Sequence, residues 1–107
     1  MTTFDEREKG FEAKFRRDEE LRFRVTARRN KLLGLWAADL LGLQGEAAEA
    51  YAKEVVHSDF ETPGDDDVLQ KVLADLQGKD TQMSQEIVRK RMDELLAEAE
   101  AQLMHES

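Results

Sequence analysis

Apolar residues recur along the chain at the three- and four-residue steps of an amphipathic helix, in four separate stretches. These stretches predict helices at about residues 18–41, 46–59, 63–77 and 82–104. The apolar face expected for the first helix consists of Leu21, Val25, Leu32, Leu35, Trp36 and Leu40. The faces expected for the other three are Ala48, Tyr51, Ala52 and Val55; Leu69, Val72, Leu73 and Leu76; and Ile87, Val88, Met92, Leu95, Ala99 and Leu103.

Glycine and proline mark the breaks between these stretches. Gly42 and Gly45 separate the first two helices, and Gly78 is expected to end the third. Thr62-Pro63 is a start signal for the third helix, with threonine as the N-cap and proline at the first helical position. Two long outer helices and two short inner ones predict an all-α protein, a four-helix bundle over residues 18–107.

The first 17 residues have a pattern of their own. Phe4, Phe11 and Phe15 follow one another at steps of seven and four and so share one helical face. Continuing that face leads to Arg22 and Arg29 and not to the apolar face predicted for the first helix. Because a lone helix of this length is marginal in water, residues 1–17 are expected to form a flexible or partly helical tail, frayed when free and ordered on a partner.

Gly34 lies inside the first predicted helix, between Leu33 and Leu35. It either lets another helix approach closely or is a neutral surface glycine, and the sequence does not separate these two interpretations.

Composition supports the helical prediction and limits the function. Ala, Glu, Lys, Leu and Arg make up 55 of the 107 residues, which is typical of long helices.

The net charge of −8 is divided unevenly, with +3 over residues 1–31 and −11 over residues 32–107. An acidic chain is a poor match for nucleic acid or an anionic membrane, and no apolar run is long enough to insert into a bilayer. There is no cysteine, which excludes disulfides, and the amino terminus lacks the apolar region of a secretory signal.

Three groups of residues have spacings or charges that could serve a chemical function. Glu54 and His57 have the Glu-x-x-His spacing of di-metal bundles, but such a site needs a second copy and further carboxylates, so no metal is expected. Arg28, Arg29 and Lys31 could contact a nucleic acid or an acidic protein surface, although a paired or solvated helix face is the simpler interpretation. Asp65-Asp66-Asp67 suits a helix amino terminus. With no phosphate loop or nucleophile motif present, neither a cofactor nor an enzymatic activity is predicted.

The amino-terminal third of the chain resembles a known family. Four stretches are similar to the zeta subunit of alphaproteobacterial F-type ATP synthases: Phe4-Asp5-x-Arg7-Glu8, Phe11-Glu12-x-Lys14-Phe15, Asp18-Glu19-Glu20-Leu21-x-Phe23 and Ala27-Arg28-Arg29-Asn30-Lys31-Leu32-Leu33-Gly34-Leu35-Trp36-Ala37-Ala38. The likeness extends over nearly the whole chain.

The resemblance implies a four-helix bundle that docks on the catalytic head of the synthase. It implies that the tail inserts between an α and a β subunit near the rotor γ subunit and blocks ATP hydrolysis. The tail positions that match the family are Phe4, Arg7, Glu8, Phe11, Glu12, Lys14 and Phe15. A monomeric cytoplasmic protein, held at the inner membrane only through the synthase, is the corresponding expectation. The alternative is a helical adaptor with another partner.

Overall fold

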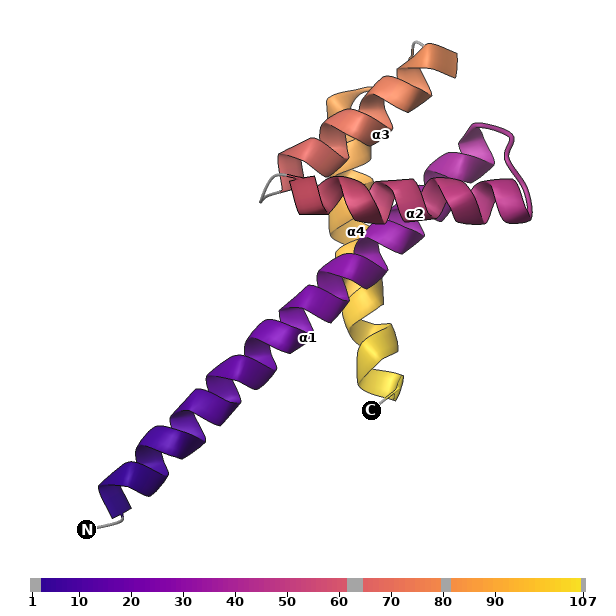
Figure 1. Ribbon diagram of the computed structural model, residues 1–107. Coiled ribbons are helices and arrows are strands. Elements are labelled where there is room, and N and C mark those ends of the chain that lie inside the picture. Colours follow the sequence, from indigo (N-terminus) through magenta and orange to yellow (C-terminus); the bar gives the residue numbers. More distant parts are fainter. Residues whose placement is uncertain (1–2, 62–64, 80–81, 107) are drawn as a thin grey trace.

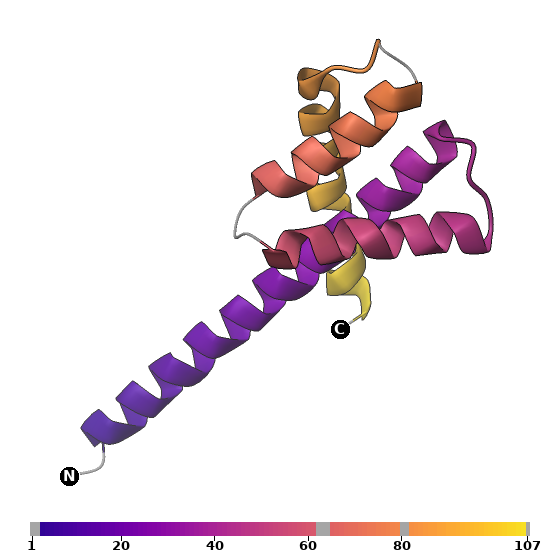
Figure 2. The same ribbon diagram turned by 45° about the horizontal axis from the view of Figure 1, so that its top comes forward.

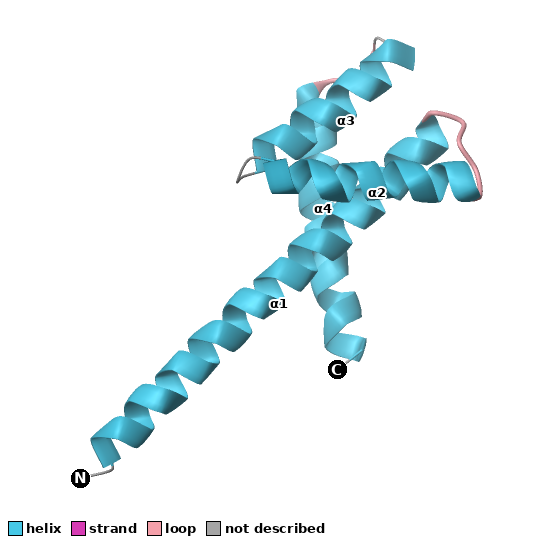
Figure 3. Ribbon diagram, in the orientation of Figure 1, coloured by secondary structure: helices cyan, strands magenta, loops and turns pink. Residues whose placement is uncertain are grey.

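The computed structural model describes the backbone of residues 3–61, 65–79 and 82–106, and the side chains of residues 19–58, 65–79 and 82–106. Four helices account for most of this part of the chain: α1 (Thr3–Leu40), α2 (Glu46–Glu61), α3 (Asp65–Lys79) and α4 (Gln85–Glu106). No strand occurs in these ranges (Figure 3). The predicted all-α class with four helices is therefore confirmed.

Helix α1 organises the molecule, since each of the other three helices contacts it. Helix α2 crosses its carboxy-terminal half, α3 lies beyond α2, and α4 passes on another side (Figure 1). The amino-terminal half of α1 projects away from the other helices in both views (Figures 1 and 2). The molecule is consequently elongated, measuring 65 × 25 × 21 Å.

The core lies where the four helices meet. It is formed by Leu33, Ala37 and Ala38 of α1 with apolar side chains of the other three helices. Those further side chains are Tyr51, Val55, Val68, Leu69, Val72, Leu73, Leu76, Val88, Met92 and Leu95. The apolar faces predicted for α2, α3 and α4 are thus largely confirmed, except that Ile87 is 47% exposed.

Gly34 sits at the crossing of α1 and α2. A Cβ atom added there would lie 2.6 Å from the Cα atom of Ala52 and 3.3 Å from Cβ of Val55. Glycine is required because the two helix backbones approach this closely, so the first of the two interpretations of Gly34 holds.

The end of α1 is a Schellman motif. Gly42 has a φ of 81°, a left-handed conformation that glycine adopts without strain. The amide of Leu43 donates to the carbonyl of Ala38 at 2.9 Å, and the amide of Gly42 donates to the carbonyl of Asp39 at 3.1 Å. This local sequence therefore ends α1 near the predicted residue.

Ser84 determines where α4 begins. Its hydroxyl accepts a hydrogen bond from the amide of Ile87 at 3.3 Å, which is the N-cap arrangement. The helix consequently starts at Gln85, three residues later than the predicted 82–104 boundary. The predicted cap of α3, Thr62-Pro63, lies outside the described residues, and α3 continues through Gly78 to Lys79.

The core face predicted for α1 needs correction. Leu21 and Leu40 are 49% and 46% exposed, and Leu32, Leu35 and Trp36 are only partly buried. The buried residues are instead Val25, Arg29, Asn30, Leu33, Gly34, Ala37 and Ala38. Helices pack on α1 from more than one side, so its buried surface is wider than a single stripe and includes small residues that permit close approach.

The start of α1 is consistent with the prediction of a partly helical tail. The helical backbone begins at Thr3, so residues 3–17 and the bundle part of α1 form one continuous helix. No break separates the segment that was predicted as a tail from the helix predicted over 18–41.

Candidate partner-binding site

The predicted partner-binding positions all lie on the projecting part of α1. Positions 4, 7, 8, 11, 12, 14 and 15 belong to its first four turns or so, and their side chains lie outside those that the structure describes. The structure places these positions on the same continuous helix as the described residues 19–40 of α1, so the direction in which they face relative to the bundle follows from the helical repeat.

This helical register overturns one expectation from sequence. Eighteen residues make about five turns of an α-helix. Positions 11 and 15 therefore align with Arg29 and Leu33, and both of these side chains are buried in the bundle. The aromatic positions of the projecting segment continue the true buried face of α1. They seemed to diverge because the face that they define leads to two charged residues, Arg22 and Arg29, and a buried position was not expected for an arginine.

Arg28 joins α1 to the end of α4. Its guanidinium donates to Gln102 Oε1 at 2.8 Å and pairs with Glu106 Oε1 at 2.9 Å. The side chain is partly exposed, so the pair links the two helices at the surface.

Arg29 is a buried charge with two partners inside the chain. Its side chain is 3% exposed, and its Nε donates to Asn30 Oδ1 at 2.8 Å. Its Nη2 pairs with Asp65 Oδ1 at 2.8 Å and so joins α1 to the first turn of α3. Arg28 and Arg29 are therefore both paired with carboxylates of the same chain, as the simpler interpretation of the sequence expected. Of the three basic residues considered for a secondary contact, only Lys31 is fully on the surface.

A second polar cluster joins α2 and α3. Tyr51 Oη donates to Asp75 Oδ2 at 2.8 Å, and Lys71 Nζ lies 3.2 Å from that oxygen and 5.4 Å from the tyrosine ring centroid. Burial, followed by the hydrogen bond to Asp75, raises the pKa of Tyr51 well above its usual value. This cluster links α2 to α3 through the hydrogen bond from Tyr51 to Asp75, whose carboxylate also pairs with Lys71.

The acidic residues and histidines of the described part of the chain form no group suited to a metal ion. Among the residues with described side chains, no three His, Asp or Glu side chains come together in a way that could hold a metal ion. No helix in the described ranges is long and apolar enough to cross a membrane.

Sequence reasoning missed the exposed apolar residues near the point where α1 leaves the bundle. Leu21 was assigned to the core and Phe23 was noted only in the family resemblance, yet both are more than one third exposed. A signal was available, because these two are the only uncharged residues in the stretch 16–24. Charged residues are mostly exposed in folded proteins, so a stretch this rich in charge indicates an exposed segment.

Comparisons with known proteins extend this description. The model of the family described as ATPase inhibitor subunit zeta matches residues 1–102. A protein whose structure was solved in solution by NMR is 50% identical over 81% of this chain and 99% of that one, with a TM-score of 0.72. No curated protein matches the chain.

Proposed function

Because the chain belongs to the family of ATPase inhibitor zeta subunits, we propose that it docks on the catalytic head of an F-type ATP synthase and inhibits ATP hydrolysis. In this proposal the amino-terminal segment of α1 inserts between an α and a β subunit near the rotor γ subunit. The family consists of inhibitory subunits, so the chain is a regulatory protein and carries out no reaction of its own.

The projecting half of α1 is the observation that carries the insertion mechanism. A helix that extends beyond its own bundle can enter a groove of another protein while the bundle stays outside. Recognition of this kind uses side chains at steps of three, four and seven, which is the spacing of positions 4, 11 and 15 on α1. The bundle then sets how far the helix can enter.

The partners in this proposal are the α, β and γ subunits of the synthase. The inhibitor is a monomer when free, is cytoplasmic, and reaches the inner membrane only through the enzyme to which it binds. Neither nucleic acid nor a cofactor takes part.

ATP hydrolysis by cognate catalytic head lacking this subunit tests the proposal. Wild-type chain should inhibit hydrolysis in a saturable way. The double variant Phe11→Ala, Phe15→Ala should lose inhibition at moderate concentration, because truncating two aromatic anchors weakens binding by roughly a thousandfold when each loss exceeds about 2 kcal/mol and the losses add. Phe23→Ala removes an exposed aromatic from another face of α1 and serves as the matched control, with full inhibition expected.

Two results would contradict the mechanism. Full inhibition by the double variant would move the inhibitory contact to the bundle. Failure of the wild-type chain to bind the catalytic head at all would instead favour the alternative function, a helical adaptor with another partner.

A further inference from the structure

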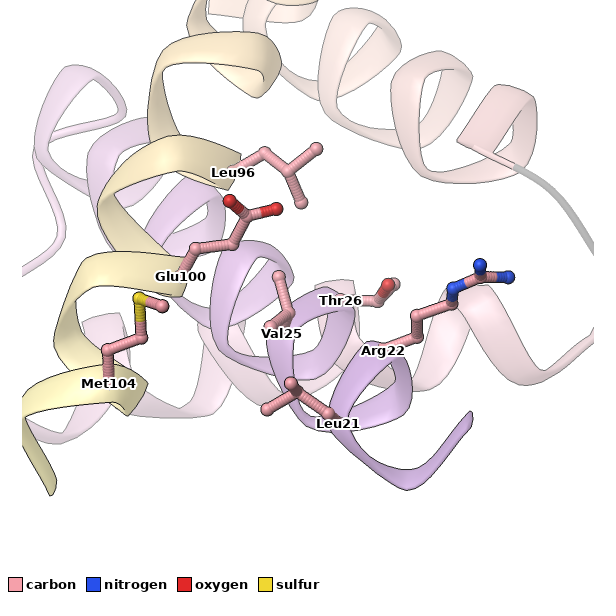
Figure 4. A pocket seen from close by; sticks show the side chains of 7 residues that line it. All are labelled: Leu21, Arg22, Val25, Thr26, Leu96, Glu100 and Met104. Carbon is pink, nitrogen blue, oxygen red and sulfur yellow. The ribbon is translucent and has the colours of Figure 1, made fainter. Parts of the chain in front are cut away.

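Helix α4 joins α1 at a definite point along its length. Side chains of both helices line one pocket there, among them Leu21, Arg22 and Val25 of α1 and Leu96, Glu100 and Met104 of α4 (Figure 4). The part of α1 before this point projects away from the other helices in both views (Figures 1 and 2).

The other two helices meet α1 further along the chain. Asp65 at the start of α3 pairs with Arg29, and Ala52 of α2 lies against Gly34. The last turns of α4, which reach Leu21, are therefore the part of the bundle that borders the projecting segment.

The molecule becomes wider where α4 joins α1. A single α-helix with its side chains is about 10–12 Å across, and a second helix packed on it adds about 8–10 Å between the two axes. The two shorter dimensions of the whole molecule are 25 and 21 Å. A groove that admits the projecting segment as a single helix consequently does not admit α1 and α4 together.

The end of α4 is held beside α1 by packing and by polar contacts. Ala99 is fully buried, and one turn later Gln102 accepts a hydrogen bond from Arg28 at 2.8 Å. Glu106, in the last turn, pairs with the same guanidinium at 2.9 Å. The last turns of α4 are thus fixed to α1 at two successive turns.

Because α1 is one continuous helix, its aromatic positions lie at fixed distances from α4. Position 15 precedes Leu21 by six residues, or about 9 Å along the helix axis, and position 4 precedes it by about 26 Å. The length of residues 3–20, about 27 Å, is therefore the length of single helix that the chain offers to a groove.

We propose that the last turns of α4 act as a steric stop, so that only the residues of α1 before Leu21 enter the catalytic head. The stop acts through width, and it positions the aromatic residues at one depth in the groove. This inference rests on the proposed function, because it specifies how far the proposed inhibitory segment inserts.

A pair of length variants of the full chain tests the inference. Residues 16–22 contain three basic and three acidic residues, so deleting or duplicating them keeps the net charge. Seven residues are two helical turns to within about 20°, so the face of the aromatic positions is kept as well. Each change moves these positions by about 10 Å relative to α4.

Inhibition of ATP hydrolysis by cognate catalytic head lacking this subunit is the measurement. Deleting residues 16–22 should weaken inhibition at least about tenfold, because α4 meets the head before the aromatic anchors reach their sites. Duplicating residues 16–22 should leave inhibition as in the wild type, because the longer helix enters to the same depth while the bundle stays further out.

The matched control is Leu21→Ala, Arg22→Ala, which removes the two deleted side chains that line the pocket and keeps the length of α1. It should inhibit like the wild type, and loss of inhibition in this control would assign the effect to the side chains and overturn the inference. Circular dichroism and thermal midpoints check folding, which should persist because Val25 and the later buried residues of α1 are retained.

A second arm tests whether α4 is the stop. Removing residues 101–107 from the deletion variant ends α4 about two helical turns earlier and should restore part of the lost inhibition. No recovery by a truncated chain that remains folded would contradict α4 as the stop.

The outcomes separate this inference from the proposed function. Full inhibition by the deletion variant would overturn the stop and leave the proposed function standing. Loss of inhibition by both length variants would show that the bundle must bind the head at a fixed distance, which also overturns a stop that acts through width. Absence of inhibition by the wild type would contradict the proposed function itself.

Discussion

Two helical glycines have opposite surroundings, and they show how a residue's neighbours determine its role. Gly34 lies against the backbone of Ala52 at the crossing of α1 and α2, whereas an added Cβ at Gly78 on α3 would meet nothing within 4 Å. Neither has a positive φ, so alanine suits both backbones. Space alone distinguishes the two positions.

Gly34→Ala should therefore destabilise the protein by about 1–3 kcal/mol, since the new methyl group must push the two helices apart. Gly78→Ala is the matched control and should stabilise it by up to about 1 kcal/mol, because alanine is the better helix former. Chemical denaturation of both variants measures these changes. A stable Gly34→Ala protein would show that the crossing can widen freely.

Tyr51 is the only tyrosine of the chain, so its ionisation can be followed by the ultraviolet absorbance of tyrosinate. The unfolded chain should titrate near a pKa of about 10, and the native chain clearly above it. The native state thus keeps a proton that the unfolded state releases. The contribution of Tyr51 to stability is complete below about pH 10 and is lost as the pH rises beyond it.

Replacing Asp75 separates the two causes of this shift. Asp75→Ala removes the hydrogen-bond acceptor and should lower the native pKa of Tyr51 only in part, because burial is the larger cause. A native pKa at the ordinary value in the unmodified protein would mean that Tyr51 is more hydrated than the structure shows.

At the scale of elements, two arginines one position apart connect α1 to different helices. Arg28 pairs with the end of α4 and Arg29 with the start of α3. Asp65 also belongs to the acidic first turn of α3, where the helix dipole favours anions. Its carboxylate therefore lies in the first turn of α3 and also neutralises a buried guanidinium.

Asp65→Ala should destabilise the protein by about 2 kcal/mol more than Asp66→Ala, because a buried charged donor then loses its carboxylate. Both changes remove one acidic residue from the same first turn, so the effect on the helix dipole cancels in the comparison. Asp66 is an exposed residue whose contact to Arg89 is 3.4 Å. Thermal unfolding of the two variants gives the difference, and equal midpoints would show that water or another group replaces Asp65 at Arg29.

At the scale of the whole molecule, α1 combines two parts in one uninterrupted helix. Its carboxy-terminal half is packed by three other helices, and its amino-terminal half projects from them (Figure 1). The last turns of α4 lie beside residues 21–28 of α1. Side chains of both helices line one pocket there, and Arg28 of α1 donates a hydrogen bond to Gln102 of α4. The part of α1 that packs in the core and the part that is proposed to bind the partner are therefore separated along a single element.

Deleting residues 1–17 should accordingly leave helix packing and the thermal midpoint of the bundle nearly unchanged, because the amino-terminal half of α1 projects away from the other helices and the first buried residue among the described side chains of α1 is Val25. The same deletion should abolish inhibition of ATP hydrolysis under the proposed function. Calorimetry and the hydrolysis assay check the two expectations separately. A loss of several kcal/mol in stability would mean that the segment packs on the bundle in solution.

The candidate site was predictable only in part. The aromatic spacing and the family resemblance both indicated the first 17 residues as a binding segment. An apolar stripe on one helix can be recognised from the local sequence alone. The pocket between α1 and the last turns of α4 was not predictable. Two of its lining residues, Leu21 and Met104, are 83 positions apart in the chain, and nothing in the local sequence marks them as neighbours.

By itself the sequence determined the all-α class, the break at Gly42 and the buried faces of the short helices. These features depend on helix propensity and on periodicity within single segments. The tertiary structure decided which side of α1 is buried, why Gly34 has no side chain, and that Arg29 is a core residue. The reason is that α1 is packed by helices from distant parts of the chain, and the space and charge that they present at each position depend on where those helices lie.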